Sequence, residues 1–99
     1  MATVYILYSQ KIDHYYVGSC LDLKVRMDEH LAGKMEFAFT KRSDDWIVYF
    51  ELSNLEYQVS RKIELHIKKM KSRKYFENLV TYPEISQKLI EKYSAGSSR

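Results

Sequence analysis

The chain has 99 residues, a length that suits one domain and is too short for two well-formed cores. Its hydrophobic content of 45% can fill a core, and its three glycines and one proline argue against a disordered or collagen-like chain. The single cysteine excludes an internal disulfide framework and a cysteine-rich zinc site, while the net charge of +3 permits a nucleic-acid partner without requiring one.

The first two segments of the chain predict a β-hairpin. Residues 3–8 and 14–18 are rich in β-branched and aromatic side chains, and the stretch between them is polar. If the strands pair symmetrically about the turn, with Ser9 opposite Ile12, then Tyr5 lies opposite Tyr16. We therefore expect the two phenol groups to lie side by side.

A short helix is expected over residues 23–31. Asp22 can cap its N-terminus, and Gly33 can end it. Arg26 and His30 are one helical turn apart and share one face. The neighbouring face carries an apolar residue at every fourth position, namely Leu23, Met27 and Leu31.

After this helix, the polar residues 34–45 predict a loop and residues 46–52 predict a third strand. Asn54 or Ser53 can cap a second, longer helix. Glu64 lies at the edge of the apolar stripe of this helix, which consists of Val59, Ile63, Ile67 and Met70. Its basic face is formed by the cations on either side of Glu64, namely Arg61, Lys62, Lys68, Lys69, Lys71, Arg73 and Lys74.

The C-terminal part of the chain predicts one more helix. Residues 81–84 combine a capping box with Pro83 in the first turn, and the helix should run to about Tyr93. We expect residues 1–93 to form a single domain and residues 94–99 to form a flexible tail. The resulting order, β-β-α-β-α-α, is an α+β fold in which helices flank a three-stranded, mainly antiparallel sheet. The residues of the last helix that should face inward are Ile85, Leu89 and Tyr93.

The order of several short motifs resembles the GIY-YIG nuclease superfamily. Thr3-Val4-Tyr5 is followed by Tyr16-Val17-Gly18, then by Arg26 and His30 on the next helix, and then by Glu64. The resemblance runs from about residue 3 to residue 74 and is strongest to small stand-alone members related to the N-terminal incision domain of the excision-repair nuclease subunit. It implies a metal-dependent endonuclease that acts in repair or recombination and whose catalytic residues are Tyr5, Tyr16, Arg26, His30 and Glu64.

These residue types suit the hydrolysis of a phosphodiester. The transition state gathers negative charge on the phosphoryl oxygens, which a fixed guanidinium such as that of Arg26 can stabilise with two parallel hydrogen bonds. Glu64 can supply one carboxylate to Mg²⁺ or Mn²⁺, because such an ion keeps much of its water shell. Tyr5 or Tyr16 can orient or deprotonate the attacking water, and His30 can accept the proton or hold a tyrosine hydroxyl.

Each of these residues also has an ordinary structural explanation. Arg26 can pair with a nearby carboxylate, and Glu64 can pair with Arg61 or Lys68 within its own helix. Tyrosines in strands commonly pack, and a single histidine on a helix is commonly structural. The joint spacing of the residues, and not any one of them, favours a catalytic site.

The expected partner is nucleic acid, with DNA as the expected substrate, held through its phosphates in a salt-dependent way. The chain has no apolar run of about 18 residues and no basic leader with a cleavage site, so we expect a cytoplasmic protein without a membrane partner. Two other functions stay open, a nucleic-acid-binding accessory domain without nuclease activity and a basic helix that docks an acidic protein. The candidate phosphate contacts are Lys24, Lys41, Arg42, Lys68 and Lys71.

Overall fold

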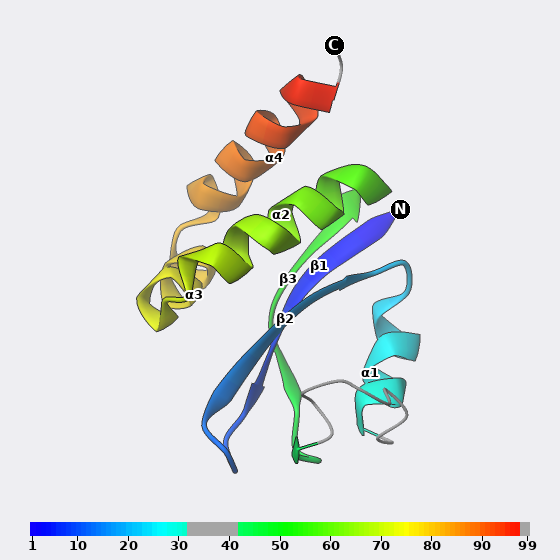
Figure 1. The fold of residues 1–99 in the computed structure, drawn as a ribbon, viewed down its shortest axis with the longest axis vertical. Coiled ribbons are helices and arrows are strands. Elements are labelled where there is room, and N and C mark those ends of the chain that lie inside the picture. The colour runs from blue at the N-terminus through cyan, green and yellow to red at the C-terminus, as the bar shows by residue number, and fades with distance from the viewer. Residues whose placement is uncertain (32–41, 98–99) are drawn as a thin grey trace.

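The computed structural model describes residues 1–31 and 42–97, and within them it has the predicted α+β arrangement (Figure 1). Figure 1 shows α1 on one side of the sheet and α2 on the other, with α3 at the end of α2 and α4 alongside α2. None of the helices in the described residues has the length and apolar character that a membrane span needs. The elements are β1 (Ala2–Ser9), β2 (His14–Cys20), α1 (Leu23–Leu31), β3 (Ile47–Leu55), α2 (Tyr57–Met70), α3 (Arg73–Thr81) and α4 (Pro83–Ser97).

Strand β1 is the centre of the three-stranded sheet that the described residues form. It lies between β2 and β3 and pairs antiparallel with both. Because helices cover both faces of this strand, almost all of its residues are buried. This burial accounts for the nearly continuous apolar and aromatic sequence at the start of the chain. In the strand order β2-β1-β3, β2 is an edge strand.

The register of the hairpin differs from the predicted one. Tyr5 pairs with Gly18 and not with Tyr16, because the turn spans residues 10–13 and the last strand pair is Ser9 with His14. Tyr5 and Tyr16 are therefore diagonal neighbours. Since the pairing is shifted by two residues, which preserves the alternation of side chains, both tyrosines still project from the same face of the sheet.

Helix α1 has the predicted bounds and the predicted cap. The side-chain oxygen Oδ1 of Asp22 accepts a hydrogen bond from the backbone N–H of Val25 at 3.2 Å. Leu23 and Met27 pack against the sheet, whereas Leu31 is 44% exposed, so the apolar stripe is shorter than predicted. The predicted helix stop at Gly33 and most of the predicted loop 34–45 lie outside the described residues.

Helix α2 begins later than predicted because β3 continues to Leu55. Its N-cap is Glu56, without a capping hydrogen bond from the side chain, in place of Asn54 or Ser53. Asn54 has a φ of 62° and remains in the strand. The predicted stripe is buried except at Met70, which is 43% exposed; its buried members are Val59, Ile63 and Ile67.

Three helices follow β3 in the described residues, where the sequence predicts two. Lys71 takes a left-handed conformation with a φ of 47° and ends α2. The next residue, Ser72, caps the additional helix α3 by accepting a hydrogen bond from the backbone N–H of Tyr75 at 3.1 Å. Phe76 and Leu79 of α3 join the core beneath α2.

Helix α4 begins at Pro83, which lies in the first turn as predicted. Leu89 is buried, and Ile85 and Tyr93 pack against the same core, so the predicted inward face is confirmed. The helix continues to Ser97, past its predicted end at Tyr93. The domain boundary at residue 93 and the flexibility of residues 94–99 stay predictions.

The sheet separates two apolar clusters, one on each face. On the α2 side, Val4 and Ile6 of β1 pack with α2, α3 and α4. On the α1 side, Tyr5 and Leu7 pack with Cys20 and with residues of α1. Because side chains alternate along the edge strand β2, neighbouring residues of this strand reach opposite faces. A site at this edge can therefore take residues from α1 and from α2.

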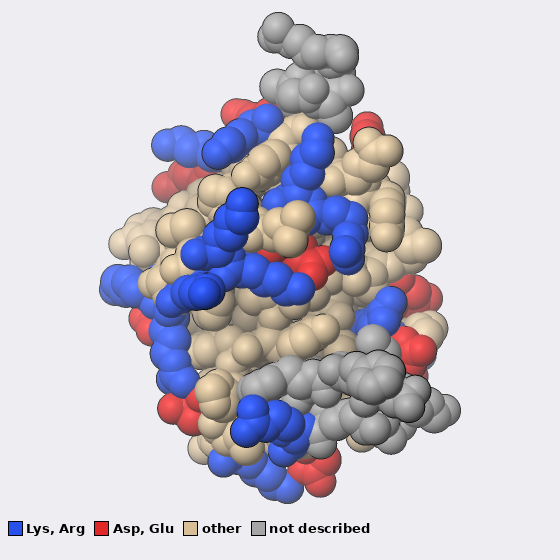
Figure 2. Space-filling view, in the orientation of Figure 1, with Lys and Arg blue, Asp and Glu red and all other residues tan. Residues whose placement is uncertain are grey.

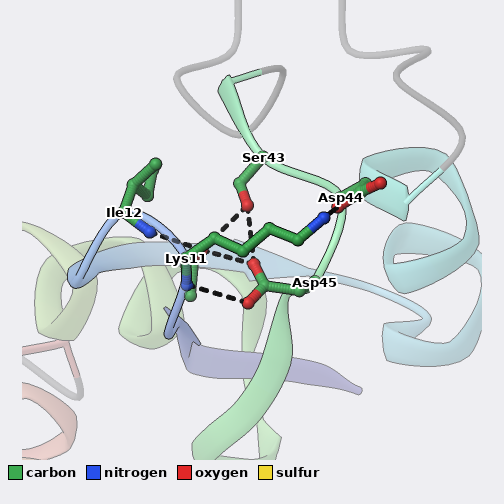
Figure 3. Close-up of polar contacts among 6 residues, drawn as sticks. Lys11, Ile12, Ser43, Asp44 and Asp45 are labelled. Carbon is green, nitrogen blue, oxygen red and sulfur yellow. Dashed lines mark hydrogen bonds and ion pairs between the residues drawn. The ribbon is translucent and has the colours of Figure 1, made fainter.

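A polar cluster ties the hairpin turn to the segment before β3 (Figure 3). The carboxylate of Asp45 accepts hydrogen bonds from the backbone N–H of Lys11 at 3.0 Å, from the hydroxyl of Ser43 at 2.6 Å and from the hydroxyl of Ser9. The ammonium of Lys11 also pairs with Asp44 at 2.6 Å. The hydrogen bonds from Ser43 and Ser9 lower the pKa of Asp45 to about 2. This cluster holds the turn and so the strand register.

Candidate active site

Tyr5 and His30 form a buried pair on the α1 side of the sheet. Their side chains are 2% and 1% exposed, and the phenol oxygen of Tyr5 lies 3.0 Å from Nε2 of His30. In the neutral imidazole tautomer that carries its proton on Nδ1, Nε2 accepts a hydrogen bond from the phenol hydroxyl. The pair is positioned by the centre of the sheet and by the last turn of α1, which are both packed in the core.

Tyr16 adds a third ring to this pair from strand β2. Its ring centroid lies 6.5 Å from that of Tyr5, with the two rings tilted, and 5.2 Å from that of His30, with the two rings edge-on. Unlike the other two side chains, that of Tyr16 is half-buried and lines a surface cavity. Of the three groups, Tyr16 is thus the one that solvent or a substrate reaches most directly.

Gly18 is opposite Tyr5 in the sheet and makes room for its phenol ring. A Cβ atom at residue 18 would lie 2.6 Å from the phenol oxygen and 2.7 Å from Cζ of Tyr5, and 3.2 Å from Cε2 of Tyr16. Real Cβ atoms do not approach other atoms so closely, so any larger residue would displace a buried ring. The glycine in the Tyr16-Val17-Gly18 motif is therefore explained by a close approach of side chain to backbone.

Glu64 approaches the same strand from α2, on the other face of the sheet. It is 5% exposed, and its Oε1 accepts hydrogen bonds from Ser19 Oγ at 2.5 Å and from Arg61 Nη1 at 3.2 Å. Its Oε2 lies 2.6 Å from the ammonium of Lys68. In Figure 2, basic side chains gather on the molecular surface over α2 and surround an acidic patch. Both predicted ion pairs of Glu64 are present.

Arg26 projects from α1 and is half-buried. Its Nε lies 3.8 Å from Oε1 of Glu29, so the predicted structural pairing occurs with one of the expected carboxylates, at a long distance. The guanidinium is also close enough to Tyr5 and His30 to influence the pKa of both side chains. It lines a cavity of about 240 Å³ next to Cys20, at the end of β2.

The protonation states of the Tyr5–His30 pair follow from its burial. Burial raises the pKa of Tyr5 above its ordinary value, and Arg26 opposes this rise. Burial, together with the positive charge of Arg26, lowers the pKa of His30. At neutral pH the phenol therefore keeps its proton and the imidazole is uncharged, and this state allows the phenol to donate a hydrogen bond to Nε2.

The five predicted catalytic residues lie close to residues 16–19 of the edge strand β2. Ser19, whose hydroxyl donates a hydrogen bond to Glu64, is not among the site residues predicted from the sequence. Alternation along β2 places Ser19 on the α2 face with Val17, and this is the sequence signal that could have indicated the contact.

The predicted phosphate contacts are spread over several elements. Lys68 contacts Glu64, Lys24 is exposed on α1, and Lys71 is exposed at the end of α2. Arg42 is exposed shortly before β3. Lys41 lies outside the described residues. Among the four that are described, Lys68 is thus the one that the structure assigns to the site itself.

The family model of the GIY-YIG catalytic domain matches residues 1–76. The chain belongs to the GIY-YIG family. The match contains all five predicted catalytic residues and ends within α3, before α4. A search of curated proteins and a search of solved structures found no match.

Membership of the GIY-YIG family makes this a nuclease-type domain whose expected substrate is nucleic acid, and it implies a divalent metal ion. Within residues 1–31 and 42–97, no group of three or more histidine, cysteine or carboxylate side chains gathers to hold such an ion. Glu64 offers a single carboxylate, buried and fixed by Ser19. A hydrated Mg²⁺ or Mn²⁺ needs only one or two protein carboxylates, so the donor set fits such an ion.

Proposed function

We propose that this GIY-YIG protein is a metal-dependent endonuclease that hydrolyses phosphodiester bonds in DNA. The observation that supports the proposal most is the arrangement around the edge strand β2. The Tyr5–His30 pair and Arg26 approach this strand from the α1 side, and the buried carboxylate of Glu64 approaches from the α2 side. A role in repair or recombination and a cytoplasmic location stay predictions.

Arg26 provides the fixed positive charge. Its guanidinium remains protonated at any working pH, and it stabilises the negative charge that builds up on the phosphoryl oxygens. Its long distance to Glu29, 3.8 Å, leaves this ion pair weak enough to be exchanged for a phosphate.

Tyr5 and His30 move the proton. The phenol of Tyr5 has a raised pKa, so it is a poor base unless its own proton leaves. His30 is uncharged and already lies at hydrogen-bond distance. In the proposed step, the phenol oxygen takes a proton from the attacking water while the phenol proton passes to Nε2 of His30. The half-buried Tyr16, which lines a surface cavity, orients that water.

Glu64 would hold the metal ion, with Ser19 fixing the direction of the carboxylate. When bound, the ion supplies positive charge to the phosphoryl oxygens and favours deprotonation of water. The side chains of Arg61 and Lys68 are 53% and 46% exposed, so both can move aside from the carboxylate at low cost.

The test is cleavage of supercoiled plasmid and of branched and single-stranded oligonucleotides, with Mg²⁺ or Mn²⁺ and with a chelator. Wild type is compared with Glu64→Gln, which keeps the shape of the side chain and removes its charge. Glu77→Gln is the matched control, because it makes the same change at an exposed position of α3. We expect metal-dependent cutting in wild type and in the control, and a loss of about 100-fold or more in Glu64→Gln.

Equal cutting by all three proteins would indicate a contaminant and would remove Glu64 from the site. If no protein cuts, but all bind the oligonucleotides in a salt-dependent way, the endonuclease proposal is wrong and the domain is a nucleic-acid-binding accessory. If none binds, the third possibility takes its place, a basic helix that docks an acidic protein.

A further inference from the structure

The two oxygens of the Glu64 carboxylate have different partners. Oε1 accepts hydrogen bonds from Ser19 at 2.5 Å and from Arg61 at 3.2 Å. Oε2 lies 2.6 Å from the Lys68 ammonium, which is the shorter of the two ion pairs. A carboxylate that is 5% exposed needs such a partner, because an unpaired buried charge is strongly destabilising. Lys68 thus neutralises the oxygen that faces away from Ser19.

Lys68 also lines a second space. A cavity of about 340 Å³ beside the edge strand is lined by His14, Tyr15, Tyr16, Val17, Lys68 and Phe76. Lys68 is the single cation of lysine or arginine type among these residues, and Tyr16 is a member of the catalytic set. The flexible Lys68 side chain can therefore leave Glu64 and extend into a cavity that adjoins the site.

We propose that Lys68 is an exchangeable counter-ion of Glu64, which a divalent metal ion displaces and which then contacts the phosphate backbone of the substrate from the cavity beside Tyr16. This inference rests on the proposed metal-dependent function. In this proposal, the Lys68 ammonium has two alternative partners, the Glu64 carboxylate and a phosphate of the nucleic acid. In the metal-free protein, its ammonium keeps the buried carboxylate paired. In the metal-bound protein, the same ammonium is available to nucleic acid.

The exchange has a thermodynamic consequence. Since metal binding frees Lys68 for a phosphate, metal and nucleic acid favour each other's binding by the same factor. A lysine suits this exchange better than an arginine, because its ammonium is a compact charge on a flexible stem and makes no rigid two-pronged contact with the carboxylate.

The first experiment measures the affinity for Mn²⁺ without nucleic acid, from the electron paramagnetic resonance signal of the free ion. Wild type is compared with Lys68→Met and with Lys69→Met, which removes the same charge one residue later, in a groove between α2 and α4. We expect Lys68→Met to bind Mn²⁺ about two- to fivefold more tightly than wild type. Lys69→Met should bind as wild type does.

Equal tightening in both variants would show a general effect of charge and would overturn the proposal, as would unchanged or weaker binding in Lys68→Met. Glu64→Gln distinguishes this failure from failure of the proposed function. If Glu64→Gln binds Mn²⁺ as tightly as wild type does, Glu64 is not the metal ligand, and both proposals fail.

A second measurement follows Lys68 directly, by the nuclear magnetic resonance signal of its ε-methylene group during titration with Mg²⁺. We expect this signal to move in wild type, with the same midpoint as metal binding, and to stay constant in Glu64→Gln. A constant Lys68 signal in wild type at saturating Mg²⁺ would overturn the exchange even if the metal binds.

Discussion

The phenol oxygen of Tyr5 lies 3.0 Å from Nε2 of His30, and both side chains are almost completely buried. Neither group has the ordinary acid–base properties of its type, because burial raises the pKa of the phenol and lowers that of the imidazole. Burial thus favours the uncharged pair and opposes proton transfer between its members.

Replacement of Tyr5 by phenylalanine tests the proton path. Tyr5→Phe keeps the ring and removes the hydroxyl, so we expect the cleavage rate to fall by about 100-fold to 10,000-fold. Stability should fall as well, by about 1–3 kcal/mol, because Nε2 of His30 loses its buried partner. Single-turnover cleavage and urea unfolding measure the two effects. Cutting at the wild-type rate by a folded Tyr5→Phe protein would exclude Tyr5 from the reaction.

The matched control for this prediction is Tyr49→Phe. Tyr49 lies on β3 and packs edge-on against Tyr15 in the core on the α2 side. Its loss of a hydroxyl should leave the cleavage rate unchanged. If both variants cut more slowly by the same factor, the fold is generally sensitive to the loss of a tyrosine hydroxyl. The slower cleavage by Tyr5→Phe would then not indicate a role of Tyr5 in the reaction.

The lowered pKa of His30 predicts a dependence of stability on pH. The unfolded histidine takes up a proton near its ordinary pKa of 6.5, whereas the folded one does so only at lower pH. The unfolded state therefore binds more protons in this window. The contribution of His30 to stability is complete above about pH 6.5 and decreases as the pH falls toward the folded pKa.

Urea unfolding between pH 5 and pH 8 measures this dependence. His66 also has a lowered pKa, through burial and the charges of Lys92 and Lys69, and contributes in the same direction. We therefore expect a smaller loss of stability on acidification in His30→Gln and in His66→Gln than in wild type, and the smallest in the double variant. An unchanged slope in all three variants would contradict the assignment.

A second pH-dependent contribution comes from Asp45, at more acidic pH. Its pKa in the folded protein is about 2, below the ordinary value of 3.8, because Ser43 and Ser9 donate hydrogen bonds to its carboxylate. The stabilisation is present above about pH 4 and is lost as the pH falls toward 2. Asp45→Asn should be less stable than wild type at pH 7 and should lose less stability between pH 4 and pH 2. Parallel stability curves for the two proteins would contradict this role.

The sequence predicted the elements whose periodicity is local and strong. The bounds of α1 and the apolar stripe of α2 depend on residues within a few turns of one another, and both were predicted correctly except for Met70, which is exposed. The capping serine and the apolar pair of α3 were also visible in the sequence, as Ser72 followed by Phe76 and Leu79. This helix was missed because the basic run around it suggested a continuous helix surface.

The strand register could not be predicted from local sequence. The turn residues 10–13 lack a strong two-residue turn signal, and the backbone of Lys11 is held by Asp45, which lies 34 positions further along the chain. The contact of Ser19 with Glu64 likewise joins residues 45 positions apart. Such contacts exist only after the sheet and α2 have packed, so the sequence could predict candidate catalytic residues but not their geometry.

Gly18 pairs with Tyr5 in the sheet, and the phenol of Tyr5 lies next to His30. Replacement of Gly18 therefore tests both the strand register and the proposed proton path. A Cβ atom at residue 18 would lie 2.6 Å from the phenol oxygen of Tyr5, whose ring is buried and has little freedom to move. We expect Gly18→Ala to lower stability by roughly 1–3 kcal/mol, as overpacking of a core does, and to reduce the cleavage rate by displacing the phenol from His30.

The double variant Gly18→Ala with Tyr5→Leu separates this close contact from other effects of the alanine. Leucine lacks the ring atoms that meet the new Cβ, so the cost of the alanine should be smaller in the Tyr5→Leu background than in wild type. Urea unfolding of the four proteins in the cycle gives the coupling energy between the two positions. Additive losses would mean that the alanine acts elsewhere on β2, and the pairing of Tyr5 with Gly18 would then not explain why this position is a glycine.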